Sequence, residues 1–96
     1  QLLYLTASSQ IQAFDKDDRP KTTQPITISV KLQNASGTAT FTAIPYIGIT
    51  AQTPIPLGGT GNDRTLLPSQ WVNPDWTTIA ITATLGSLTD TVSILE

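Results

Sequence analysis

The sequence predicts an all-β fold, an antiparallel β-sandwich of about seven short strands, on the strength of two observations. Apolar and polar residues alternate through several segments, as they do in a strand with one buried face. Between these segments lie residues that favour turns, mainly Gly, Pro, Asn and Asp. A helical period long enough to compete with this interpretation is missing from the sequence.

The clearest pattern lies in residues 77–95. Before Gly86-Ser87 the large apolar side chains stand at odd-numbered positions, and after it they stand at even-numbered positions up to Ile94. Thr, Ser and Ala fill most of the alternate positions. A two-residue loop that begins with Gly suits a tight hairpin, because its first position needs a positive φ. Asp90 shares the apolar parity, and we expect it to reach water or to accept threonine hydroxyl bonds. The residues predicted to face the core are Ile79, Ile81, Ala83, Leu85, Leu88, Val92 and Ile94.

The other elements follow from the same two signals. In residues 26–33 the inward positions are Ile26, Ile28, Val30 and Leu32, and Phe41 is the one large apolar residue of the next strand. The predicted strands are residues 2–8, 26–33, 38–44, 46–50 and 64–67, with 11–14 continuing the first after a kink. The predicted connections are loops at 15–25, 34–37 and 53–63, and a crossover with one helical turn at 68–75.

Size and charge limit the classes of function. The 96 residues correspond to a single domain, 1–96, and the missing initial Met indicates a segment of a longer multidomain chain. The chain has no cysteine, a net charge of −2 and only five basic residues, which are scattered. Nucleic-acid binding needs a clustered positive face, so no nucleic-acid partner is expected. No apolar run is long enough to span a membrane, so membrane insertion is not expected.

Catalysis finds little support in the composition. The absence of histidine excludes an imidazole base. A pair of carboxylates could hydrolyse glycosides, but most of the acidic residues fall in predicted loops, so we predict that the protein is not an enzyme. Residues 15–18 (DKDD) lack the glycine and distal glutamate of a calcium loop, and residues 58–61 (GGTG) lack the lysine and helix of a phosphate loop. We therefore expect no metal and no cofactor.

Three aromatic residues, Tyr46, Trp71 and Trp76, are the candidates for ligand contact, because aromatic faces stack on sugar rings and are frequent in binding sites. The structural alternative, which we favour for all three, assigns them to packing. In that interpretation Trp71 caps the open end of the core from the crossover, and Trp76 covers a sheet edge.

Four stretches of the sequence resemble the immunoglobulin-like modules of bacteriophage tail proteins, such as tail-tip host-specificity proteins and central tail fibres. They are LLYLTASSQIQAFDKDDRP, PITISVKLQNASGTATFTA, RTLLPSQW and IAITATLGSLTDTVSIL, which together cover nearly the whole chain. Phe14, Gln33-Asn34, Phe41 and Asp90 stand where the features of these modules would fall. The family often has Trp in the position of Phe41, so we expect another aromatic residue, such as Trp71, to fill the remaining space.

The resemblance implies an immunoglobulin-like sandwich, a location on the virion, and a non-catalytic structural role as a spacer that helps host attachment. The implied partners are other domains or subunits of the tail, with host surface polysaccharide or an outer-membrane protein as the target of attachment. The alternative is a carbohydrate- or protein-binding immunoglobulin-like repeat of an adhesin on the bacterial cell surface. Exposed aromatic residues gathered in one patch would favour the binding module, and chain ends at opposite ends of the domain would favour the spacer.

Overall fold

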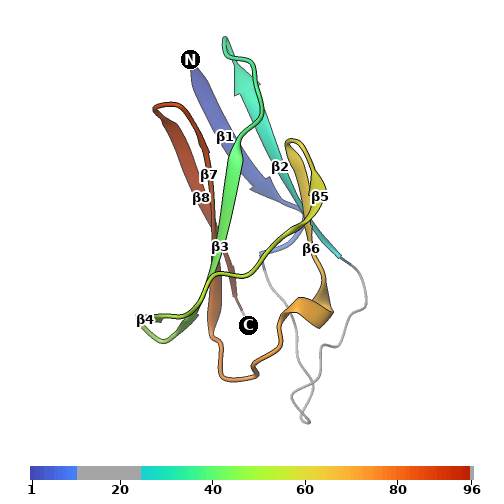
Figure 1. Cartoon of the computed structure of the whole chain (residues 1–96), viewed down its shortest axis with the longest axis vertical. Helices are drawn as coiled ribbons and strands as arrows, with labels where there is room; N and C mark the ends of the chain where they lie inside the picture. The colour runs from blue at the N-terminus through green and yellow to red at the C-terminus, as the bar shows by residue number, and fades with distance from the viewer. Residues whose placement is uncertain (11–24, 96) are drawn as a thin grey trace.

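A computed structural model describes residues 1–10 and 25–95 as two stacked antiparallel sheets (Figure 1). The first sheet has the order β1 (Leu2–Ala7), β2 (Ile26–Gln33), β6 (Asp63–Leu66) and β5 (Gly58–Thr60). The second has the order β4 (Thr50–Ala51), β3 (Thr40–Ile47), β7 (Thr78–Leu85) and β8 (Leu88–Leu95). This is the immunoglobulin-like strand order with a short extra strand, β4, at one edge. The predicted all-β sandwich is confirmed, with eight strands in the described residues instead of about seven.

Strand boundaries were predicted most accurately where apolar and polar residues alternate most regularly. The predicted strand at 26–33 coincides with β2, and Gly86 has φ 59° in the two-residue turn between β7 and β8. The crossover contains the expected helical turn, η1 (Pro68–Gln70). The predictions for residues 11–14 and for the acidic loop at 15–24, including Phe14 and DKDD, lie outside the described residues.

The predicted break at Pro45 is wrong, because β3 continues through this proline to Ile47. Proline has no N–H to donate, so it fits in a strand only where that N–H is not needed by a neighbour. Here the Pro45 carbonyl accepts from the Gln52 N–H at 2.8 Å, on the β4 side of the strand. The adjacent Tyr46 carbonyl accepts from Thr77 N–H at 2.8 Å, toward β7. The Pro45 nitrogen therefore faces away from β7, and no hydrogen bond between β3 and β7 is lost.

The predicted loop at 53–63 is also partly wrong, because its second half forms a hairpin of β5 and β6 around Gly61-Asn62. Glycine is needed in β5 by close approach: a Cβ on Gly58 would lie 2.6 Å from Thr65 Oγ1. Asn62 then joins this turn to the connection between β2 and β3. Its side chain accepts from the Ala39 N–H at 2.8 Å and donates to the Gly37 carbonyl at 2.9 Å.

The core lies between the two sheets, and most of the side chains that form it are those predicted to face inward. Ile79, Ile81, Val92 and Ile94 are buried from the β7–β8 hairpin, opposite Ile26 and Ile28 of β2. Val30 and Leu32 also face the core but are only half-buried. Trp71 belongs to the core against which Phe41 packs. The Arg64 guanidinium lies over the Phe41 ring, 5.0 Å from its centre, which is within the range of a cation–π interaction.

A seam between β1 and β8 joins the edges of the two sheets. The Asp90 carboxylate accepts from the Leu5 N–H of β1 and from the Thr91 N–H, both at 2.9 Å. Farther along the seam, the Leu95 N–H donates to the Gln10 carbonyl at 2.8 Å. Asp90 was expected to meet water or threonine hydroxyls, but its partners are backbone N–H groups of two edge strands. Because these N–H groups are bonded within the protein, the edges of β1 and β8 offer fewer free donors to a strand of another chain.

Replacing Asp90 with Ala is expected to lower the free energy of unfolding by roughly 1–3 kcal/mol, because two backbone donors lose a charged acceptor. The matched control is Asp63→Ala, which removes an exposed carboxylate from the outer face of β6 and should change stability by less than about 0.5 kcal/mol. Urea unfolding measures both, and amide hydrogen exchange should quicken at Leu5 and Thr91 in the Asp90 variant alone. Equal stability of the two variants would contradict the role of the seam.

Candidate functional site

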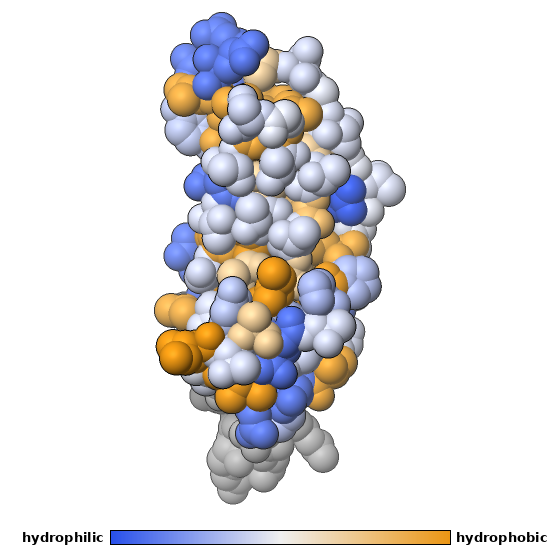
Figure 2. All heavy atoms as spheres, turned by 60° about the vertical axis from the view of Figure 1, so that its left-hand side comes forward, coloured by the Kyte–Doolittle hydropathy of each residue, from blue (hydrophilic) through white to orange (hydrophobic). Residues whose placement is uncertain are grey.

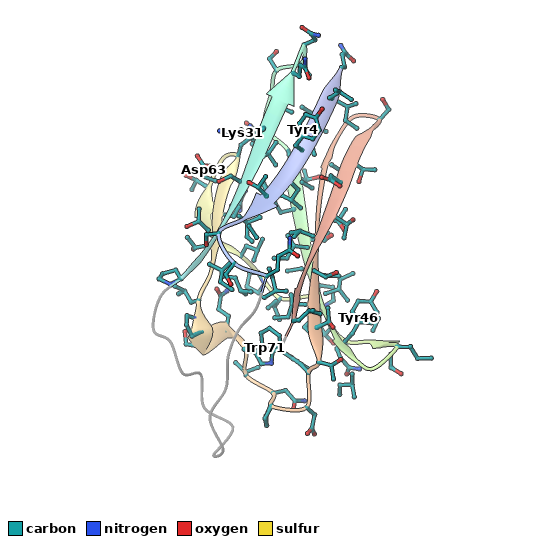
Figure 3. The ribbon with its side chains drawn as sticks, turned by 180° about the vertical axis from the view of Figure 1, so that it is seen from behind. Tyr4, Lys31, Tyr46, Asp63 and Trp71 are labelled. Atoms are coloured by element: carbon teal, nitrogen blue, oxygen red, sulfur yellow. The ribbon has the colours of Figure 1, made fainter. Side chains whose placement is uncertain are left out.

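The three aromatic residues singled out by the sequence do not form one exposed cluster. Trp71 and Trp76 are 5% and 7% exposed and belong to the core. Tyr46 is half-buried on the outer side of β3, whereas Trp71 lies near the crossover at the lower end of the core (Figure 3). Burial of both indoles agrees with the packing interpretation and takes away most of the surface that they could offer to a sugar. Tyr46 is the one of the three that keeps substantial contact with solvent.

The stretch at 52–56, which includes the start of the predicted loop at 53–63, is attached along β3. The Gln52 and Ile55 N–H groups each donate a bond of 2.8 Å, to the carbonyls of Pro45 and Ala43. Gln70 also reaches this stretch, through a bond from its side-chain amide to the Pro56 carbonyl. These bonds fix the stretch against the edge of the sandwich, so it presents less free backbone to a ligand than an open loop would.

The outer face of the sheet formed by β3, β7 and β8 carries no charged side chain. Its middle consists of threonines, visible as pale rows in Figure 2. The hydroxyls pair across strands, with 3.0 Å between Thr82 and Thr91, and Thr40 donates to the Thr84 carbonyl at 3.3 Å. The four cross-strand rows of this uncharged face are Thr40–Thr84–Thr89, Thr42–Thr82–Thr91, Ile44–Ala80–Ser93 and Tyr46–Thr78–Leu95.

The outer face of the other sheet has a different character. Tyr4 of β1 pairs with Lys31 of β2, and Asp63 of β6 pairs with Ser29 on the same side (Figure 3). Mixed charge of this kind keeps a surface solvated. The uncharged face is therefore the better candidate for contact with another protein surface, since no charge has to be desolvated there.

The two ends of the long axis also differ. At the N-terminal end, Gln1, the turn at 34–36 and the turn at 85–88 surround a shallow depression of about 660 Å³. At the opposite end, which we call the crossover end, several large apolar side chains are exposed. They are Ile47, Ile49, Leu67, Val72 and Leu95. None of these residues was predicted to be functional, although Gly48-Ile49 is an unusually apolar turn for a sequence of this kind.

The acidic side chains in the described part of the chain lie on separate elements of the fold. Of the acidic residues considered for a carboxylate pair, Asp63, Asp75 and Asp90 lie on β6, the crossover and the seam. Within residues 1–10 and 25–95, no three His, Cys, Asp or Glu side chains come together in a group that could hold a metal ion. The described residues likewise include no helix long and apolar enough to cross a membrane.

Comparison with known proteins gives no relative from which a role could be transferred. No protein-family model, no curated protein and no solved structure matches the chain.

Proposed function

We propose that this protein is a non-catalytic structural module of a bacteriophage tail fibre or tail-tip protein, in which it acts as a spacer. The observation that carries the proposal is the direction of the chain. The strands run along the longest dimension of a body that measures 46 × 27 × 17 Å. Gln1 lies at one end of this axis, and the last strand ends well toward the other (Figure 1). A chain that enters and leaves in this way separates its neighbours by the length of the sandwich.

Two further features support a structural role. The seam at Asp90 and Gln10 ties the two sheets together along one edge. The uncharged face gives the module a surface that can pack against other subunits of an assembly with little desolvation cost. The resemblance of the sequence to immunoglobulin-like tail modules supplies the proposed setting on the virion.

The adhesin alternative receives less support from these surfaces. A glycan-binding repeat would be expected to gather exposed aromatic rings in one patch. With Trp71 and Trp76 buried, Tyr46 is the one of the three candidates that is not part of the buried core. We therefore retain the spacer as the proposed function.

The proposal is tested by joining one, two and three copies of the chain directly and measuring their maximum dimensions by small-angle X-ray scattering. A spacer predicts a nearly constant increment for each added copy, approaching the 46 Å length of the body. The matched control inserts a flexible Gly-Ser linker between the copies, which should make the increment variable and the particle less extended. An increment near the 27 Å or 17 Å widths would mean that the copies fold back side by side and would overturn the spacer.

A further inference from the structure

The first and last strands of the domain lie side by side at one edge of the sandwich and run in the same direction. Both begin at the N-terminal end of the long axis, where Gln1 and the turn before β8 line one depression. The Leu5 N–H donates to the Asp90 carboxylate at 2.9 Å. The Leu95 N–H donates to the Gln10 carbonyl at 2.8 Å. Both contacts join residues that are 85 positions apart, which is the register of two parallel strands.

Asp90 supplies a link between strands that belong to different sheets. Its two oxygens accept from different strands: Oδ2 accepts from the Leu5 N–H of β1, and Oδ1 accepts from the Thr91 N–H of β8. Hydrogen bonds to a charged acceptor are roughly twice as strong as bonds between neutral groups. The seam between β1 and β8 therefore contains a strong contact at a place where the two sheets do not share a backbone ladder.

A tensile load applied through the two chain ends would run along this seam. Gln1 lies at one end of the long axis, and β8 ends well toward the other (Figure 1). Tension through the ends would therefore pull β1 and β8 in opposite directions along their own lengths. Releasing β1 requires breaking the seam together with the ladder to β2, and releasing β8 requires breaking the seam together with the ladder to β7. In either case the bond between Leu5 and Asp90 has to break.

We propose that the seam between β1 and β8, anchored by Asp90, is a clamp that resists tension along the long axis of the domain. The inference rests on the proposed spacer function, because a module carries such a load only when it is linked at both ends. Resistance to force is governed by the rate of unfolding, so it depends on contacts that break on the way to the transition state. The clamp therefore predicts that Asp90 matters more under load through the chain ends than under load applied elsewhere.

Optical tweezers at constant force measure this dependence on direction. In the first arrangement, cysteines added at the two chain ends carry the handles, which is possible because the chain has no cysteine of its own. In the second, the handles are attached through Ser36→Cys and Val72→Cys. Both positions are exposed, Ser36 at the N-terminal end and Val72 in the crossover, so this load also runs between the two ends of the molecule but bypasses β1 and β8. A general loss of stability speeds unfolding in both arrangements, so the difference between them isolates the clamp.

Under load through the chain ends, Asp90→Ala is expected to raise the unfolding rate about tenfold, the factor for losing one hydrogen bond to a charged acceptor. Under load through positions 36 and 72 the same change should raise the rate by a clearly smaller factor. The matched control, Asp63→Ala, removes an exposed carboxylate from the outer face of β6 and should leave both rates unchanged. Asp90→Asn keeps one acceptor oxygen, so it should show the same dependence on direction at smaller size, and it replaces the Ala variant if that variant does not fold.

Equal acceleration in the two arrangements would overturn the clamp, since Asp90 would then contribute to overall stability alone. A rate that does not change under load through the chain ends would overturn it as well. Extended tandem copies in the scattering experiment together with equal acceleration would leave the spacer standing without a clamp. A directional effect together with tandem copies that fold back would retain the clamp and overturn the spacer.

Discussion

Replacing Ile81 with Asp is expected to unfold the domain. Ile81 is fully buried on β7, between Ala43 of β3 and Val92 of β8 in the cross-strand register. A carboxylate at this position would lose its hydration and would find no cation among these neighbours. We expect the free energy of unfolding to fall by at least about 4 kcal/mol, close to the roughly 5–15 kcal/mol total of an ordinary domain. Circular dichroism and urea titration measure the loss of the cooperative transition.

The matched control for this prediction is Thr84→Asp, which places the same charge on the same strand but on its exposed outer face. Its stability should stay within about 1 kcal/mol of the parent. An Ile81→Asp variant that melts within a few degrees of the parent would show that the inward face of β7 has been assigned incorrectly.

Truncating Trp71 to Ala is expected to have the second largest effect, a loss of roughly 3–5 kcal/mol of unfolding free energy. The indole is 5% exposed and packs in the core beside the crossover, so its removal leaves a cavity that the short turn η1 cannot fill. Trp71→Phe should recover much of the loss because it restores most of the buried apolar volume. Urea unfolding followed by circular dichroism gives the values without depending on tryptophan fluorescence.

Val72→Ala serves as the control for Trp71, since it truncates the next side chain of the same crossover, which is 73% exposed. Its effect should stay below about 0.5 kcal/mol. If Trp71→Ala is no more harmful than Val72→Ala, the indole is not part of the core, and its earlier assignment as a ligand contact becomes attractive again.

The outer faces of the two sheets differ in charge. The face that contains Lys31 and Asp63 keeps charge in contact with water, whereas the uncharged face and the exposed Ile49 side chain offer contacts that need little desolvation. Under the proposed spacer function, packing against other subunits would use the uncharged face.

The sequence alone determined the layers of this protein and much of its core. The alternation in residues 26–33 and 77–95 assigned the buried positions correctly, because a side chain in a half-buried strand can take only one of two faces. Gly86 likewise marked its turn by local chemistry. The Gly61-Asn62 turn carried a similar signal, but the glycines of β5 have no strand preference of their own and become a strand through pairing with β6.

Only the tertiary structure decided where residues without an alternating neighbourhood would lie. Pro45 stays inside β3 because its nitrogen faces away from β7, and Arg64 points inward because the Phe41 ring lies there to receive it. Asp90 found backbone donors because β1, 85 residues away from it in sequence, runs along the same edge. The exposed apolar residues of the crossover end and the depression at the N-terminal end depend on the same long-range arrangement. Each of these contacts joins segments that are distant in the chain, and local composition does not encode such distances.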